Sequence, residues 1–137
     1  MRSTPPAVNT LLEGRRCHMV DSRQKGADGE REFRDVLRSE GWLGAKRGQQ
    51  RSGLEEADVV GGPAGVHFEV KRVQALHLRT AYAQAVRDAA GIKHAVVVHR
   101  RNSDTQWLAT LDARTLLRMV SLLESLGVDL PALEGLS

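Results

Sequence analysis

The pattern of hydrophobic and polar positions is clearest in the segment 58–71, where two short hydrophobic strands flank a turn of glycine, proline and alanine over residues 61–65. Such a turn between two strand patterns predicts a β-hairpin. Side chains two residues apart share one face of a strand. Glu69 and Lys71 therefore point the same way, while their neighbours enter the core. The hairpin brings Asp58 towards Glu69, with Lys71 beside them.

The rest of the chain alternates between helical and strand patterns. Apolar residues at helical spacing predict helices over about residues 22–40, 80–90 and 113–126. Further strands are expected within residues 42–58, over 93–99 and over 106–111. The order is helix, three strands, helix, two strands, helix. A central mixed β-sheet flanked by helices buries these elements compactly, so the expected fold class is α/β.

The first predicted helix carries one acidic residue on its hydrophobic side. Glu30 lies three residues after Ala27 and three before Phe33, in a stripe that continues to Leu37. A carboxylate on the inward face of a helix needs an explanation, whereas one on the outward face does not. Glu30 is either an edge residue whose carboxylate reaches solvent or a residue that points into a functional site.

Composition and charge restrict the class of protein. The chain has 137 residues, 41% of them hydrophobic, and a formal net charge of +3, which suits one globular domain. The single Cys17 excludes an internal disulfide framework. No apolar run is long enough to cross a membrane, and the N-terminal residues lack a signal-peptide pattern. We therefore expect an intracellular protein that does not contact membranes.

A basic loop follows the first helix. Lys46, Arg47 and Arg51 cluster between glycine and serine residues that leave the backbone adaptable. Arginine forks match the geometry of phosphate groups, and a basic loop of this kind suits a nucleic-acid backbone. The alternative is an ordinary solvated loop, whose charge Glu55 and Glu56 partly offset.

Three carboxylates are expected to converge, those of Glu30, Asp58 and Glu69. Carboxylates held close together repel one another, and a divalent cation removes that problem. Oxygen-only ligands suit Mg²⁺, for which Mn²⁺ can substitute. His67 shares the face of Glu69 and could line the site, although the five histidines show no metal-ligand spacing. Lys71 can orient a nucleophile or stabilise developing negative charge, so the pattern favours a phosphodiesterase.

Two motifs resemble a known group of nucleases. Asp58, ten further residues and then Glu69-Val70-Lys71 resemble the PD-(D/E)XK nuclease superfamily. The helix opening Lys25-Gly-Ala-Asp-Gly-Glu-Arg-Glu-Phe33 is similar to that of archaeal-type Holliday junction resolvases, a group that also occurs in phages. The resemblance covers roughly residues 25–99.

The resemblance implies a restriction-endonuclease-like fold and Mg²⁺-dependent hydrolysis of four-way DNA junctions by a homodimer. It implies catalytic roles for Glu30, Asp58, Glu69 and Lys71, the three carboxylates being the metal ligands. Residues expected to contact DNA are Lys25, Arg31, Lys46, Arg47, Arg51, Ser52 and Arg72. Gln84 matches a glutamine that supports the site in related nucleases.

The chain departs from the family pattern in three places. Ala57 replaces the proline that usually precedes the aspartate, and the loop over residues 46–56 is long, so either Arg47 or Arg51 is the loop arginine of the family. The resemblance excludes the N-terminal arm and the helical C-terminus. The expected organisation is an arm over residues 1–21, a nuclease domain over 22–127 and a tail over 128–137.

Three other interpretations of the same residues stay open. The chain could be another small nuclease of the superfamily, of restriction, nicking or flap-processing type. It could be a DNA-binding module without catalytic activity. The complete set of four candidate residues argues against such a loss of activity. The carboxylates could also be surface salt-bridge partners.

Overall fold

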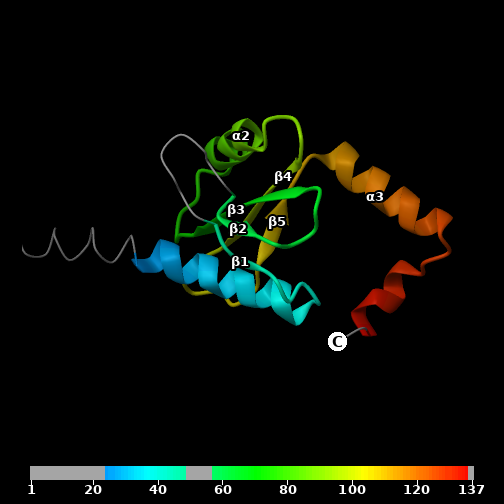
Figure 1. Ribbon diagram of the computed structural model, residues 1–137, viewed down its shortest axis with the longest axis horizontal. Coiled ribbons are helices and arrows are strands. Elements are labelled where there is room, and N and C mark those ends of the chain that lie inside the picture. The colour runs from blue at the N-terminus through cyan, green and yellow to red at the C-terminus, as the bar shows by residue number, and fades with distance from the viewer. Residues whose placement is uncertain (1–23, 49–56, 136–137) are drawn as a thin grey trace, which may run out of the picture.

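The computed structural model describes residues 24–48 and 57–135 (Figure 1). Its first element is a helix over residues 24–39, called here the N-terminal helix. The later elements, in chain order, are β1 (Lys46–Arg47), β2 (Val59–Val60), β3 (Val66–Arg72), α2 (Leu78–Ala89), β4 (His94–Arg100), β5 (Leu108–Thr110), α3 (Ala113–Ser125) and a 3₁₀ helix (Leu130–Gly135). This order confirms the sequence prediction.

The five strands form one mixed sheet in the order β1-β2-β3-β4-β5. Antiparallel pairing joins β1 to β2, β2 to β3 and β4 to β5, and only β3 and β4 run parallel. A parallel pair needs a crossover connection, and α2 provides it. The fold is therefore α/β, with a five-stranded mixed sheet and three helices.

The two faces of the sheet are covered by different helices (Figure 1). Phe33 and Leu37 of the N-terminal helix pack against Phe68 and Val96 on one face. On the other face, Ala81 and Ala85 of α2 lie against Val97 of β4, together with partly buried leucines. Small alanines let α2 approach the sheet closely. The low aromatic content of the chain, 4%, is reflected in this valine- and alanine-rich core.

Helix boundaries agree with the predicted end signals to within two residues. Gly41, with a left-handed φ of 110°, follows the N-terminal helix. Helix α2 begins at Leu78, two residues before the predicted Thr80. It ends at Ala89, and Ala90 takes the left-handed cap conformation, one residue before the predicted stop at Gly91. The Asp112 carboxylate accepts the Thr115 N–H at 3.0 Å and caps α3, as predicted.

The C-terminal part leaves the sheet and extends to one side (Figure 1). The apolar stripe predicted on α3 exists, but none of the α3 residues is buried. Leu116 is 46% exposed and Leu126 is 70% exposed. The tail forms the 3₁₀ helix over Leu130–Gly135. No helix in the described part of the chain has the length and hydropathy needed to cross a membrane.

Candidate active site

The β2–β3 hairpin forms as predicted and places Asp58 beside β3. Val59 pairs with Phe68 in antiparallel register, and the Asp58 N–H donates to the Phe68 carbonyl at 3.2 Å. The Val70 N–H donates to Asp58 Oδ2 at 2.9 Å. One oxygen of the Asp58 carboxylate is therefore fixed by the backbone of β3, and Oδ1 accepts no hydrogen bond from the other described residues.

Glu69 and Lys71 lie on one face of β3, as the alternation predicts. Lys71 Nζ lies 2.9 Å from Glu69 Oε1. Glu69 is only 4% exposed, and Lys71 is half-buried. Phe68 and Val70 point to the opposite face, into the cluster formed with the N-terminal helix. A buried carboxylate is costly unless it is paired, and Lys71 provides one such partner.

Glu30 reaches the same region from the N-terminal helix. Its Oε2 accepts a hydrogen bond from Arg47 Nε of β1 at 2.8 Å. Glu30, Arg47, Gly48 and Asp58 line one pocket of about 180 Å³. The inward-facing glutamate of the sequence pattern therefore lies beside Asp58, and it is ion-paired with the side chain of Arg47.

The electrostatics of the pocket centre on Asp58. Burial is the largest of the effects that raise the pKa of Asp58 to about 7, and the negative charges of Glu69 and Glu30 act in the same direction. The Val70 N–H and the Lys71 ammonium lower this pKa and only partly offset the increase. A carboxyl group held among other carboxylates and away from water favours either a proton or a cation as its partner. The pocket is therefore an electrostatic site for positive charge.

The donor set fits a hard divalent cation, with one restriction. Asp58, Glu69 and Glu30 offer only oxygen atoms, which are the ligands that Mg²⁺ and Mn²⁺ prefer. Their oxygens do not all lie within 4.8 Å of one another, since the only such group among the described residues is a different one. Asp58 and Glu69 are the residues that would hold the ion, and Glu30 would join them after a side-chain rotation that breaks its pair with Arg47.

Several residues expected to contact DNA are exposed on the surface. Lys25 and Lys46 are exposed. Arg31 is also exposed and pairs with Asp28, its Nη1 lying 3.1 Å from Oδ1. Exposed pairs of this kind contribute little to stability, so Arg31 can exchange Asp28 for a phosphate at low cost.

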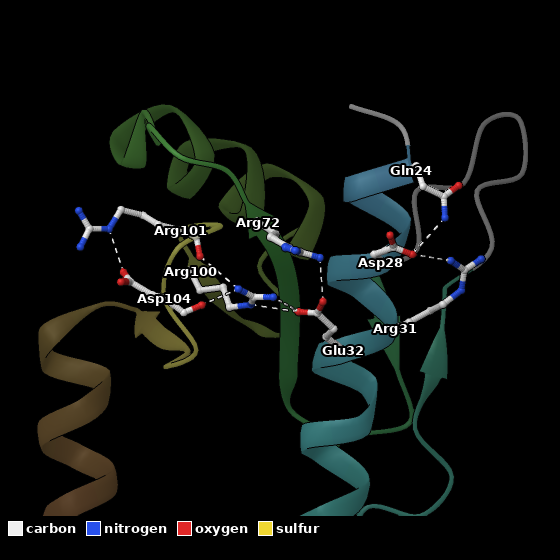
Figure 2. A network of polar contacts seen from close by, with 8 residues as sticks. All are labelled: Gln24, Asp28, Arg31, Glu32, Arg72, Arg100, Arg101 and Asp104. Carbon is white, nitrogen blue, oxygen red and sulfur yellow. Dashed lines mark hydrogen bonds and ion pairs between the residues drawn. The ribbon is translucent and has the colours of Figure 1, made fainter. Parts of the chain in front are cut away.

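Arg72 has a structural partner instead. Arg72 Nη1 donates to Glu32 Oε1 at 2.7 Å, and Arg100 Nε donates to Glu32 Oε2 at 3.0 Å (Figure 2). Arg72 Nε is buried without a hydrogen-bond partner among the described residues. The sequence prediction treated Arg72 only as a DNA contact and missed this anchoring network, because Glu32 and Arg100 are 68 residues apart.

Three further predicted residues are placed as follows. Arg51 and Ser52 lie outside the described residues, so the choice between Arg47 and Arg51 as the loop arginine stays a prediction. Gln84 is half-buried on α2, one turn before Asp88. Its side chain makes no hydrogen bond to the other described residues, and its supporting role also stays a prediction.

One group was missed by sequence reasoning. Asp88 of α2 lies beside His67 and Glu69, and one donor atom of each residue lies within 4.8 Å of the others. Burial lowers the pKa of His67, while the charges of Asp88 and Glu69 oppose that effect. The histidines show no metal-ligand spacing along the sequence. A ligand set can nevertheless combine two residues that lie two apart on a strand with a third residue from a helix that packs on that strand. The feature of the sequence that could have indicated this group is the position of Asp88 on α2, three residues after Ala85 and one before Ala89.

Comparison with protein-family models, with curated proteins and with solved structures gave no match to this chain.

Proposed function

We propose that this chain is a divalent-cation-dependent endonuclease that hydrolyses phosphodiester bonds in branched DNA and resolves four-way junctions. One observation carries the proposal. The carboxyl of Asp58 lies in a pocket with Glu30, is perturbed by the charges of Glu30 and Glu69, and has Lys71 beside it. Glu30 comes from the N-terminal helix, Asp58 directly precedes β2, and Glu69 and Lys71 lie on β3.

The sequence motif supports the same proposal. Asp58 and the Glu69-Val70-Lys71 triplet keep the spacing of the PD-(D/E)XK superfamily. The element order of helix, three strands, helix and strand is compatible with a restriction-endonuclease-like topology. We include that topology in the proposal.

The reaction would be hydrolysis of one phosphodiester bond by water. A water oxygen forms a bond to phosphorus while the bond from phosphorus to one sugar oxygen breaks. One proton leaves the attacking water, and one proton reaches the departing sugar oxygen. A bound Mg²⁺ ion supplies Lewis-acid stabilisation of the negative charge that develops on the phosphate. Asp58 and Glu69 would hold that ion.

The remaining side chains would orient the reactants. Lys71 Nζ, 2.9 Å from Glu69 Oε1, has further N–H groups that can donate to the attacking water or to a phosphate oxygen. Arg47 lines the same pocket as Glu30. If Glu30 turned towards the ion, the guanidinium of Arg47 would be released to pair with a phosphate.

Resolution of a junction requires two cuts in opposed strands. We propose that two copies of the chain form a symmetric dimer, because an isologous interface places two identical sites around a two-fold axis. Contacts to the DNA would be mainly to phosphates, from exposed residues such as Lys25, Arg31 and Lys46, and would carry little base specificity.

The test is a cleavage assay with purified full-length chain on an end-labelled four-way junction and on a linear duplex of the same arm sequence. We expect paired nicks in the junction with Mg²⁺, and binding without cleavage in EDTA. D58N and E69Q should lose cleavage and keep binding, and D129N, at an exposed position of the C-terminal segment, should cleave normally. Equal cutting of both substrates would refute junction selectivity, and cleavage by D58N would refute the site.

A further inference from the structure

A second cluster of candidate ligands lies on the face of β3 that α2 covers. His67 and Glu69 are two residues apart on β3, and Asp88 lies in the last turn of α2. One donor atom from each of the three side chains lies within 4.8 Å of the other two. Two elements that pack against each other therefore bring together one imidazole and two carboxylates.

The burial of this cluster is unusual for groups of its polarity. His67 and Glu69 are each only 4% exposed, and Asp88 is half-buried. His67 Nε2 has no hydrogen-bond partner among the described residues. Buried polar atoms are nearly always paired, and two neighbouring carboxylates repel each other. Lys71 compensates only part of this buried polarity. It pairs with Glu69 Oε1, and His67 Nε2 still has no partner among the described residues.

We propose that His67, Glu69 and Asp88 bind a divalent transition-metal ion such as Zn²⁺. An imidazole nitrogen favours such an ion over Mg²⁺, whereas carboxylate oxygens accept either. Two ligand atoms of a tetrahedral ion with bonds of about 2.1 Å stand ~3.4 Å apart, so donors within 4.8 Å of one another would reach the ion after side-chain rotations. Three protein ligands leave one coordination position for water.

This site shares Glu69 with the proposed Mg²⁺ site and takes its other two ligands, His67 and Asp88, from outside it. His67 and Asp88 take no part in the proposed nuclease reaction, so the inference does not depend on that reaction. The ion would join α2 to β3, because its ligands come from both elements. Glu69 belongs to both sites, and an ion on the α2 side would hold its carboxylate in place next to Lys71.

The experiment uses the metal-free full-length chain in buffer with excess Mg²⁺, which occupies oxygen-only sites. Zn²⁺ binding is measured by calorimetry, and Co²⁺ is used as a spectroscopic probe of nitrogen ligation. We expect one strong Zn²⁺ equivalent, a rise in melting temperature and visible Co²⁺ bands. H67Q and D88N should each weaken Zn²⁺ binding on the order of 100-fold, since loss of even an indirect metal contact costs 10- to 100-fold.

Matched controls separate this site from other histidines and from the nuclease pocket. H94Q changes an exposed histidine of β4 and should bind Zn²⁺ as the wild type does. D58N should also keep the Zn²⁺ equivalent, whatever its effect on DNA cleavage. Because His67 is buried, D88N at a half-buried position decides the test if H67Q does not fold. Wild-type affinity in folded D88N, or the absence of a strong Zn²⁺ equivalent in the wild type, would overturn the proposal.

Discussion

The carboxyl of Asp58 lines a pocket with Glu30 and is affected by the negative charges of Glu30 and Glu69. Its Oδ2 is held by the Val70 N–H, and its pKa rises to about 7, mainly through burial and then through the charge of Glu69. Ionising this group in the folded, metal-free chain is therefore costly. Each pKa unit corresponds to about 1.4 kcal/mol, so the cost amounts to a few kcal/mol.

This pKa predicts how stability depends on pH when EDTA removes metal ions. The folded chain binds the Asp58 proton more tightly than the unfolded chain, in which this aspartate has the ordinary pKa of 3.8. The stabilisation is fully present below pH 4 and is lost as the pH rises through 7. We expect D58N, which cannot ionise, to gain stability relative to the wild type across this window, as measured by thermal or urea unfolding at several pH values.

The exposed D129N variant provides the control, because the difference in stability between D129N and the wild type should not depend on pH in this way. If the difference in unfolding free energy between D58N and the wild type were constant from pH 4 to 8, Asp58 would have an ordinary pKa and this prediction would be wrong. Excess Mg²⁺ should reduce the destabilisation of the wild type at pH 8, because a cation replaces the proton.

Gly29 fixes the distance between the N-terminal helix and β3. A Cβ atom at Gly29 would lie 2.9 Å from the Cβ of Arg72, which is too close for two carbon atoms. A Cβ at Gly26, one turn earlier, would meet nothing within 4 Å. The helix therefore lies directly on the end of β3 at Gly29, and this contact also sets the position of Glu30.

Alanine substitutions at these two glycines should have opposite effects on stability. G26A should stabilise the chain by about 0.5–1 kcal/mol, because alanine favours a helix over glycine. G29A gains the same helix propensity, but its added Cβ forces the helix away from the strand. Overpacking of this kind typically costs about 1–3 kcal/mol, so the net effect of G29A should be destabilising. Urea unfolding of both variants measures the difference. Equal stabilisation by both substitutions would contradict the close approach at Arg72.

At the scale of whole elements, Glu32 joins the N-terminal helix to the ends of β3 and β4. Its two carboxylate oxygens accept hydrogen bonds from Arg72 and Arg100 (Figure 2). The Arg100 guanidinium also lies over the Trp107 ring, 5.5 Å from its centroid. The Arg100 side chain is only 10% exposed. Removing the charge of Glu32 would leave a buried guanidinium poorly compensated.

E32Q should therefore destabilise the chain by about 1.5–3 kcal/mol, the range for hydrogen bonds to charged groups. The matched control is E40Q, at an exposed position just after the same helix, which should change stability little. Unfolding of both variants in urea provides the measurement. A stability of E32Q equal to that of E40Q would mean that the network contributes nothing to holding the helix on the sheet.

The order of the elements and the hairpin could be predicted because their signals are local. Alternation in segment 66–72 and the turn over residues 61–65 define the hairpin without any distant residue. Pairings between distant charges have no such signal. The contact of Glu32 with Arg100 and the approach of Asp88 to His67 depend on how the helices pack on the sheet. Periodicity indicates which face of a helix packs, but not which residues of the sheet that face meets.

At the scale of the whole molecule, α3 was the least predictable element. Its apolar stripe is typical of a helix that packs on a sheet, yet the helix extends to one side and buries no residue. Amphipathicity shows that a face is suited to burial and does not identify what covers it. The candidate site, in contrast, was predictable from the sequence because the inward position of Glu30 and the spacing of Asp58, Glu69 and Lys71 are independent signals.

The central claim is that Asp58 and Lys71 act together in one active site. Its most direct test is the single-turnover rate constant for cleavage of a four-way junction in Mg²⁺ by wild type, D58N, K71M and the double variant, with K93M as the exposed-lysine control. We predict a loss on the order of 100-fold or more in each single variant and little further loss in the double variant, because residues that act as a unit are not additive. Wild-type rates in the single variants, or losses that multiply in the double variant, would contradict it.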